Sequence, residues 1–329
     1  MADAGYATYL VGGVIRDQLL NRSKPPDYDL ATAAPLSVIR TLFDTRELGR
    51  RFGTIAILTD GHRIDIARLR TETGYSDHRH PDTVTFTDSI ELDLQRRDFT
   101  VNAMAWEPLT HTLLDPFRGL DDLHGGILRT VGDAHQRFSE DSLRVFRAYR
   151  FVAQLGFCLA SDAGFKTPYP LPSSDRITHE LTSLIHGPHA PTALAIMAQH
   201  GWLSRLFYPQ GDPHTWPDWS ALANQPTEFK WAWVLQTIPE PQWDWLTLPK
   251  KTKRWIRHVI AHDFHWARCH MTPADLALAS QDLMDRGFSG KALANIQEKL
   301  MDYVAYNPEA NTPERLDTYI QNAQNETSE

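Results

Sequence analysis

The sequence has 329 residues, of which 42% are hydrophobic, and its formal net charge is −8. A chain of this length divides into two or more packed units, and this share of apolar residues excludes a disordered protein. No apolar run reaches the roughly 18 residues needed to cross a bilayer, and the first ten residues lack the order of a signal peptide. We therefore expect no membrane partner and a cytoplasmic location.

The first element in the chain is a strand that runs into two glycines. Residues 8–13 (TYLVGG) form a short apolar stretch, and residues 14–21 (VIRDQLLN) then show helical spacing. Such a turn exposes backbone N–H groups beside a helix start, which is a common way to cradle phosphate. A Gly-Gly turn that binds nothing is the plain alternative.

Two aspartates follow this turn in the segment DYDLAT (27–32). If the segment is a strand, alternation sends Asp27 and Asp29 to the same face, where they repel each other unless a cation lies between them. Asp65, in the predicted strand 63–69, could add a third carboxylate. Oxygen ligands alone favour Mg²⁺ or Mn²⁺ over zinc. Two surface aspartates in a turn would give the same short pattern.

In the rest of the chain, the spacing of apolar residues is typical of strands up to about residue 134 and typical of helices after it. Further strands are predicted at 54–60, 63–69 and 84–90, with a hairpin turn at 59–62. A helix is predicted over 138–156, with Ser139 as its N-cap and Gly156 as its end. Later helices are predicted at 177–187, 190–207, 253–270 and 291–306. The sequence thus predicts an α+β protein: a small head with a mixed β-sheet followed by an all-helical arm.

Basic residues are unevenly distributed along the chain. Up to residue 155 there is one lysine against eighteen arginines, and arginine suits bidentate recognition of phosphates and bases. One dense basic run comes later, where an RNA backbone contact and a solvated helix face explain the pattern equally well. The run comprises Lys250, Lys251, Lys253, Arg254 and Arg257.

The ordered segments together resemble one branch of the DNA polymerase β-like nucleotidyltransferase superfamily, the class II tRNA nucleotidyltransferases and bacterial poly(A) polymerases. The resemblance starts with LVGGVIRDQLLNR (10–22) and DYDLAT. It continues in order through GRRFGT (49–54), RRDFTVNAMAW (96–106), LDPFRGLDDL (114–123), residues 127–151, DRITHEL (175–181), HGP (186–188) and residues 281–300.

The resemblance implies roles for individual residues. Asp27 and Asp29 match the catalytic metal carboxylates, and Asp65 matches a further acidic residue. In the implied two-metal mechanism, one ion lowers the pKa of the RNA 3′-hydroxyl and the other neutralises the triphosphate. The positions implied to hold the nucleotide are Gly12, Gly13 and Arg16 at the triphosphate, with Arg97, Asp98 and Asn102 nearby, where Asp98 accepts from a ribose hydroxyl.

The segment EDSLR (140–144) offers a way to choose a base without a nucleic-acid template. On one helix, Glu140, Asp141 and Arg144 would share a polar face, with Arg147 one turn further on. An aspartate accepts from an exocyclic amino group and an arginine donates to a ring acceptor, which favours C and A over U and G. An ordinary intrahelical ion pair is the alternative.

The resemblance implies four parts and an activity. The parts are a nucleotidyltransferase head (1–133), a neck with the nucleotide-recognition helix (134–207), a body (208–272) and a tail that binds tRNA (273–329). The activity is CCA addition to the 3′ end of tRNA from CTP and ATP, with Mg²⁺ as cofactor and no protein partner evident. Residues 70–86 are similar to the flexible loop of CCA-adding and A-adding enzymes, whereas CC-adding relatives lack much of it.

Three departures and several alternatives stay open. His80 stands where an arginine is usual, and Asn21 and Arg118 stand where glycines are usual, so the geometry of the turn at Arg118 is in doubt. A-only addition, a poly(A) polymerase and an RNA-binding protein on an inactive scaffold are the alternatives. A histidine metal or phosphohydrolase site at His258, His262, Asp263, His265 and His270 is disfavoured, because no further histidine and aspartate stand in fitting positions.

Overall fold

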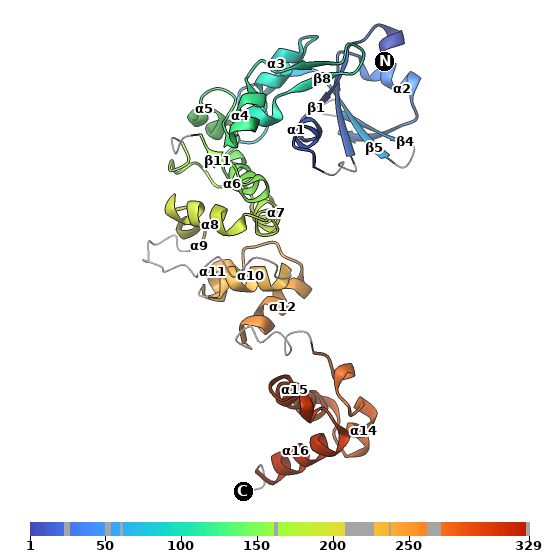
Figure 1. The fold of residues 1–329 in the computed structure, drawn as a ribbon, viewed down its shortest axis with the longest axis vertical. Coiled ribbons are helices and arrows are strands. Elements are labelled where there is room, and N and C mark those ends of the chain that lie inside the picture. The colour runs from blue at the N-terminus through green and yellow to red at the C-terminus, as the bar shows by residue number, and fades with distance from the viewer. Residues whose placement is uncertain are drawn as a thin grey trace. The chain divides into compact units, whose positions relative to one another are not determined.

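A computed structural model describes residues 1–22, 27–49, 54–59, 62–160, 164–207, 227–236, 238–261 and 271–326. The chain divides into two compact units, one of Met1–Asn224 with Ile238–Thr247 and the other of Gln225–Thr237 with Leu248–Glu329. The predicted α+β class is confirmed, with the β-sheet in the N-terminal part of the first unit (Figure 1).

The sheet of the first unit is mixed and has the strand order β3-β4-β5-β2-β1-β8-β9 within the described residues. β2 and β5 pair in parallel, whereas the other neighbours are antiparallel. The strands are β1 (Thr8–Val11), β2 (Asp27–Thr32), β3 (Thr45–Gly49), β4 (Thr54–Thr59), β5 (His62–Arg68), β8 (Ala105–Glu107) and β9 (Thr112–Leu114). The strands predicted at residues 8–13, 54–60 and 63–69 are confirmed over residues 8–11, 54–59 and 63–68, and residues 27–32 form a strand throughout. The predicted hairpin between the second and third of these agrees with the antiparallel pairing of β4 with β5.

Short helices surround the sheet because alternate strand residues are apolar. α2 (Leu36–Leu42) buries Ile39 against Ile55, Ile57 and Ile66 of the sheet. The other helices of the head are α1 (Gly13–Leu19), α3 (Ile90–Gln95) and α4 (Gly119–Gly125). A separate hairpin joins β6 (Arg70–Thr73) to β7 (Thr83–Phe86). The strand predicted over 84–90 is thus too long, since Ser89 caps α3 through Leu92 N, 3.3 Å away, and Ile90 begins that helix.

The single helix predicted over 138–156 is interrupted at Asp141 and Ser142, and its part from Leu143 to Leu155 is confirmed. α5 (Ala134–Glu140) ends at Asp141, whose backbone is extended at φ −143°, and α6 (Leu143–Leu155) begins two residues later. Asp133, not Ser139, caps the N-terminus of α5 by accepting from Gln136 N at 2.8 Å. Gly156 ends α6 in the left-handed conformation, φ 73°, as predicted.

The remaining elements of the first unit are nearly all helical. α6 packs against α7 (Ser174–Ile185) and α8 (Ala190–Gln199), and α9 (Trp202–Phe207) and α11 (Glu240–Trp243) complete the unit. The predicted helix 190–207 is broken by Gly201, φ 80°. The expectation of no strand after residue 134 is wrong at one place: β11 (Cys158–Leu159) pairs in parallel with β10 (Ile127–Leu128), because the chain that leaves α6 returns to the head.

The second unit is helical throughout its described residues. It contains α10 (Thr227–Leu235), α12 (Lys250–Ala261), α14 (Ser280–Asp285), α15 (Gly290–Tyr306) and α16 (Pro313–Glu326). The predicted helix 291–306 is confirmed. The predicted helix 253–270 is confirmed as far as Ala261, and the rest of it lies outside the described residues. No helix among the described residues is both long and apolar enough to span a membrane.

The two departures from glycine noted in the sequence lie at left-handed backbone positions. Asn21 has φ 51° and Arg118 has φ 58°, a region in which glycine is favoured because it has no Cβ. Asparagine tolerates this region better than other side chains. Arg118 is exposed and pairs with Asp121 at 2.8 Å. Both residues therefore hold a left-handed backbone conformation at some cost in strain.

Candidate active site

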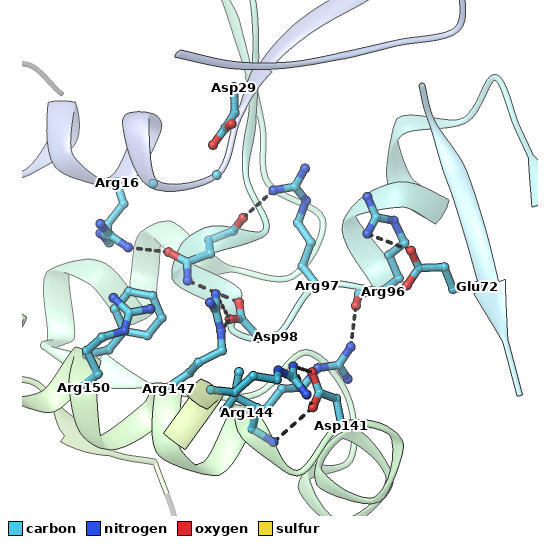
Figure 2. A pocket seen from close by; sticks show the side chains of 16 residues that line it. Arg16, Asp29, Glu72, Arg96, Arg97, Asp98, Asp141, Arg144, Arg147 and Arg150 are labelled. Atoms are coloured by element: carbon cyan, nitrogen blue, oxygen red, sulfur yellow. Dashed lines mark hydrogen bonds and ion pairs between the residues drawn. The ribbon is translucent and has the colours of Figure 1, made fainter. Parts of the chain in front are cut away.

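A pocket of about 520 Å³ lies in the first unit, where residues of the head meet residues of the neck (Figure 2). Its walls are strongly charged. Head residues that line it are Gly12, Gly13, Arg16, Asp29, Glu72, Arg96, Arg97, Asp98 and Asn102. Neck residues that line it are Asp141, Leu143, Arg144, Arg147, Arg150, Phe151 and Arg176. The fold thus brings together nine of the ten predicted nucleotide-binding residues. The tenth, Glu140, does not line the pocket but forms an ion pair with Arg144.

The Gly-Gly turn forms one edge of the pocket. Gly12 has φ 78°, and a Cβ placed on it would lie 3.3 Å from Arg97 Nη1 and 3.7 Å from Asp29 Oδ2. Glycine is favoured here by the positive φ, and a Cβ would also need a small shift of the Arg97 side chain. Arg16, one turn along α1, donates to Asn102 Oδ1 at 2.7 Å and to Asp17 at 2.9 Å. These bonds fix the Arg16 guanidinium against the pocket.

The predicted metal carboxylates lie on β2 and β5. Parallel pairing sets Asp29 beside Asp65, on strands about 4.8 Å apart. Arg63 donates to both oxygens of Asp65, at 2.9 Å and 3.0 Å. Asp29 lines the pocket and Asp65 does not. Asp27 pairs in register with Arg63, and its side chain lies outside the described part of the chain.

The aspartates on β2 and β5 have the donor atoms that a divalent cation prefers. The described residues contain no cluster of three or more acidic, histidine or cysteine side chains suited to a metal ion. The donor chemistry nevertheless fits, because Asp29 and Asp65 supply only carboxylate oxygens and are neighbours on β2 and β5, with Asp29 lining the pocket. Asp65 would have to exchange its pairing with Arg63 for the metal.

Asp98 links the head to the neck. Its Oδ2 accepts from Arg147 Nε at 2.8 Å and Nη2 at 2.6 Å, and its Oδ1 accepts from Phe99 N and from Asn102. Burial alone would raise the pKa of Asp98, but the charge of Arg147 and these hydrogen bonds lower it to about 2. Asp98 is therefore a fixed anion at neutral pH.

Two neighbouring arginines share one buried carboxylate. Asp93, 1% exposed, accepts from Arg96 at 2.9 Å and from Arg97 at 3.3 Å. Arg97 also reaches the backbone oxygen of Asn102 at 3.5 Å, and its Nε is buried without a hydrogen-bond partner. Burial lowers the pKa of Arg97, and the charge of Asp93 opposes that effect. Arg97 remains cationic and faces the Gly12 turn.

Glu140, Asp141 and Arg144, which were predicted to recognise the base, do not share one helix face, because the helix is interrupted at Asp141. Arg144 donates to Glu140 at 2.8 Å, as its spacing predicts. Asp141 instead accepts from Arg176 of α7 at 2.9 Å, and from Leu143 N at 3.1 Å. Arg144 also donates to the backbone oxygen of Arg96 at 3.2 Å. Figure 2 shows Asp141 and Arg144 together on the neck side of the pocket.

The sequence reasoning missed six pocket residues. They are Glu72, Arg96, Leu143, Arg150, Phe151 and Arg176. Arg96 and Arg176 lie inside quoted motifs, RRDF and DRITHEL, so the motif boundaries could have found them. Glu72 lies in residues 70–86, the segment similar to the family's flexible loop, in which no single residue was assigned a role. Burial would raise the pKa of Glu72, but Arg96 and Arg70 lower it below its usual value.

The predicted RNA-binding run lies on α12, in the second unit. Lys250, Lys251, Arg254 and Arg257 are exposed, and Ile256 and Val259 are buried. The same helix therefore has a basic face and an apolar face. His262, Asp263, His265 and His270 of the histidine alternative lie outside the described residues.

Comparison with known proteins identifies the family. The family model described as Poly A polymerase head domain matches residues 8–129. The CCA-adding enzyme of Geobacillus kaustophilus is 38% identical over 248 residues, which cover 73% of this chain and 58% of that enzyme. The CCA-adding enzyme of Geobacillus stearothermophilus is 41% identical over 203 residues, 60% of this chain and 50% of that enzyme.

The match to solved structures extends over the whole chain. The crystal structure of the Bacillus stearothermophilus CCA-adding enzyme in complex with CTP has a TM-score of 0.62 and 26% identity, and the match covers 99% of this chain and 95% of that one. The chain belongs to the class II tRNA nucleotidyltransferase and bacterial poly(A) polymerase family.

Family membership bears on the metal at the site. Nucleotidyltransferases of this family generally use divalent metal ions, in line with the oxygen donors at Asp29 and Asp65. The structure of the Thermotoga maritima CCA-adding enzyme complexed with tRNA shares the fold, with a TM-score of 0.66 at 20% identity. The chain spans about half to three-fifths of the length of the curated relatives that it matches.

Proposed function

We propose that the chain is a template-independent tRNA nucleotidyltransferase that adds CCA to the 3′ end of tRNA from CTP and ATP. One observation carries the proposal: Asp29, the Gly12–Gly13 turn and the Asp141–Arg144 pair line a single pocket. A carboxylate that can hold a cation, backbone at a phosphate site and a polar pair for a base are thus within reach of one nucleotide. The similar structure that holds CTP supports the same assignment.

The reaction joins the RNA 3′-oxygen to the α-phosphorus of the nucleotide and breaks the bond between that phosphorus and the bridging oxygen. Pyrophosphate leaves. Asp27, Asp29 and Asp65 would hold divalent ions, proposed to be Mg²⁺, which supply a lower pKa at the 3′-hydroxyl and neutralise charge on the pyrophosphate. The carboxylates of this chain fix that charge at the edge of the pocket where the glycine turn lies.

The head residues are proposed to bind the triphosphate and the ribose. Arg16 and Arg97 bring positive charge to the Gly12 turn, and both are held by bonds that exist before the nucleotide arrives. Donors that are fixed before reaction cost no reorganisation during it. Asp98 is an anion oriented by Arg147 and Asn102, so it can accept from a ribose hydroxyl. A deoxyribose would leave that carboxylate without this donor.

The neck residues are proposed to select the base. Asp141 can accept from the exocyclic amino group of cytosine or adenine, and Arg144 can donate to the ring acceptor beside it. Glu140 fixes Arg144 through its ion pair at 2.8 Å. Uracil and guanine present a carbonyl where Asp141 needs a donor, and they are therefore disfavoured.

We propose that α12 takes part in binding the tRNA. Its exposed basic residues suit phosphate contacts, whereas residues 273–329 carry ten acidic against four basic side chains. A tail with this balance would have to bind tRNA through shape and hydrogen bonds more than through charge. The four-part division, with neck, body and tail, remains part of the proposal. A cytoplasmic location is proposed because tRNA is the substrate, and cell fractionation would test it.

The test uses purified protein, Mg²⁺ and three tRNA substrates, ending in the discriminator base, in C or in CC. CTP and ATP are supplied separately and together. Incorporation on all three substrates is expected. Addition only after CC would instead identify an A-adding enzyme, and long adenosine tails would identify a poly(A) polymerase. Tight tRNA binding with no incorporation on any substrate would leave an RNA-binding protein on an inactive scaffold.

A further inference from the structure

A buried aromatic ring beneath the pocket is surrounded by arginines. Phe151, on α6, is 4% exposed and lines the pocket. The guanidinium carbon lies 4.1 Å from the ring centre for Arg150, 5.2 Å for Arg16 and 5.6 Å for Arg147. All three distances fall within the range in which a cation is attracted to an aromatic face.

Each of these arginines also has its own carboxylate partner. Arg16 pairs with Asp17, Arg147 with Asp98 at 2.6 Å and Arg150 with Glu180 at 2.6 Å. These partners lie on three different segments of the chain. The charges of Asp98 and Glu180 also act on Arg150 and Arg147 respectively, but none of the three carboxylates forms an ion pair with all three guanidinium groups. Phe151 is what they have in common.

The arginines keep donors to spare. Within the described part of the chain, Arg147 Nη1 and Arg150 Nη2 make no hydrogen bond. Both residues line the pocket. The attraction between a guanidinium group and the face of the Phe151 ring uses no N–H bond. The ring can therefore position these guanidinium groups while their free N–H donors stay available to an anionic ligand.

Phe151 itself packs against a second aromatic ring. Phe99, which is fully buried, packs against it edge to face, with ring centres 5.6 Å apart and planes at 83°. This arrangement is a preferred one for aromatic pairs. The ring is therefore fixed before a ligand arrives, and the arginines that rest on it are fixed with it.

We propose that Phe151 is a positioning residue for the nucleotide site: its ring holds Arg150, Arg16 and Arg147 against mutual repulsion and so sets the affinity for the anionic nucleotide. The inference rests on the proposed function, because it takes a nucleoside triphosphate as the ligand. A ring has two faces, so three cations cannot all be optimal. Arg150, the nearest, depends on the ring most.

The first experiment compares Phe151→Leu with Phe146→Leu. Phe146 lies on the same helix, is 1% exposed and packs against Trp202 at 5.2 Å, with no pocket arginine on its ring. The Kd of CTP and of ATP is measured by equilibrium titration without tRNA. Phe151→Leu is expected to raise both values by roughly tenfold, and Phe146→Leu by less than about twofold.

Kinetics on tRNA separate positioning from simple loss of structure. Phe151→Leu is expected to raise KM for CTP and ATP by the same factor, with kcat and the discrimination against UTP and GTP unchanged. A general loss of structure would lower kcat and the melting temperature in both leucine variants alike, and that result would overturn the proposal.

A second experiment keeps the ring and changes only its charge distribution. Phe151 is replaced by phenylalanine analogues with one, two and three ring fluorines, which weaken the negative face in steps at nearly constant shape. The logarithm of the Kd for CTP is expected to rise with each fluorine. A Kd that is flat across the series would overturn the proposal even if Phe151→Leu fails to fold.

The outcomes also distinguish this inference from the function on which it rests. If wild-type protein binds CTP but transfers no nucleotide to tRNA, the proposed function fails, and the fluorine series still decides the role of Phe151. If wild-type protein extends tRNA while the fluorine series leaves the Kd unchanged, the function stands and the role of Phe151 is refuted.

Discussion

The head wall and the neck wall of the pocket are built differently. On the head wall, the glycine turn and Asp29 are placed by the backbone and by β-sheet register, which sets Asp29 beside Asp65. The neck wall consists of long side chains placed by ion pairs, such as Arg144 with Glu140 and Asp141 with Arg176. Backbone fixes the first set of groups, and other side chains fix the second.

This difference suggests how the two walls divide the work. Groups fixed by backbone hold one position for every nucleotide, which suits bond formation. Groups fixed by side chains can exchange partners, which suits the recognition of two different bases, C and A. Substitutions in the head wall should therefore stop turnover, whereas substitutions in the neck wall should change the choice of nucleotide.

The largest effect is expected for Asp29→Ala. Loss of a carboxylate that holds the proposed metal should lower kcat by about a thousandfold, about 4 kcal/mol, while tRNA affinity stays nearly unchanged. Steady-state incorporation and a tRNA binding titration check this result. Asp88→Ala, which removes an exposed acid of the head outside the pocket, is the control. Retained turnover in Asp29→Ala would refute the metal assignment.

A smaller effect is expected for Asp98→Asn, where the two walls meet. The folded pKa of Asp98, about 2, lies below the usual value of 3.8, so the ionised form stabilises the fold above about pH 4 and that stability is lost as pH falls through 2. The variant should lower the free energy of unfolding by about 2 kcal/mol at pH 7.

Urea unfolding at several pH values checks this prediction. The difference between wild type and Asp98→Asn should shrink between pH 4 and pH 2. Asp121→Asn, which removes an exposed carboxylate paired with Arg118, serves as the control and should change stability little at any pH. A difference that is independent of pH would show that Asp98 does not stabilise the fold through its charge.

Asp141→Ala tests selection in the neck wall. Loss of the acceptor should reduce discrimination against UTP and GTP by about tenfold, on the order of 1.4 kcal/mol, with CTP and ATP still used. Asp141→Asn, which keeps one carbonyl acceptor, should lie between wild type and Asp141→Ala. Competition between nucleotides on tRNA ending in CC measures the ratio. Unchanged discrimination would remove the base-selection proposal.

The smallest effect is expected outside both walls, at Arg118. Arg118→Gly relieves left-handed strain at φ 58° and loses only an exposed ion pair, so the free energy of unfolding should rise by about 0.5 kcal/mol. Asn21→Gly should change stability less, because asparagine already tolerates this region. Equal shifts for the two variants in urea unfolding would contradict this explanation.

The head wall was more predictable from sequence than the neck wall, for a physical reason. Alternating apolar residues and a Gly-Gly pair mark β1, β2 and the turn locally, so residues close in the chain were enough. The break at Asp141 leaves the apolar spacing of 138–153 intact and depends on Arg176, which is 35 residues away. Local periodicity cannot contain that contact.

The same limit explains why the cluster of arginines around Phe151 was not predicted from the sequence. Arg150 and Phe151 occupy helical positions that are also compatible with a plain packed neck, and only the meeting of α6 with α1 gives Phe151 its contact to Arg16. Asp98 was predicted from its motif, but its partner Arg147 lies 49 residues further on. Sequence indicated which residues matter, and tertiary packing determined which of them touch.

The most direct test of the central claim is a crystal structure of the chain with CTP and Mg²⁺. The triphosphate should lie against Gly12, Gly13 and Arg16, with metal at Asp29 and the cytosine amino group on Asp141. CTP bound in another cavity, or in this pocket with its base toward Asp29 and its phosphates toward Asp141, would contradict the division between the two walls.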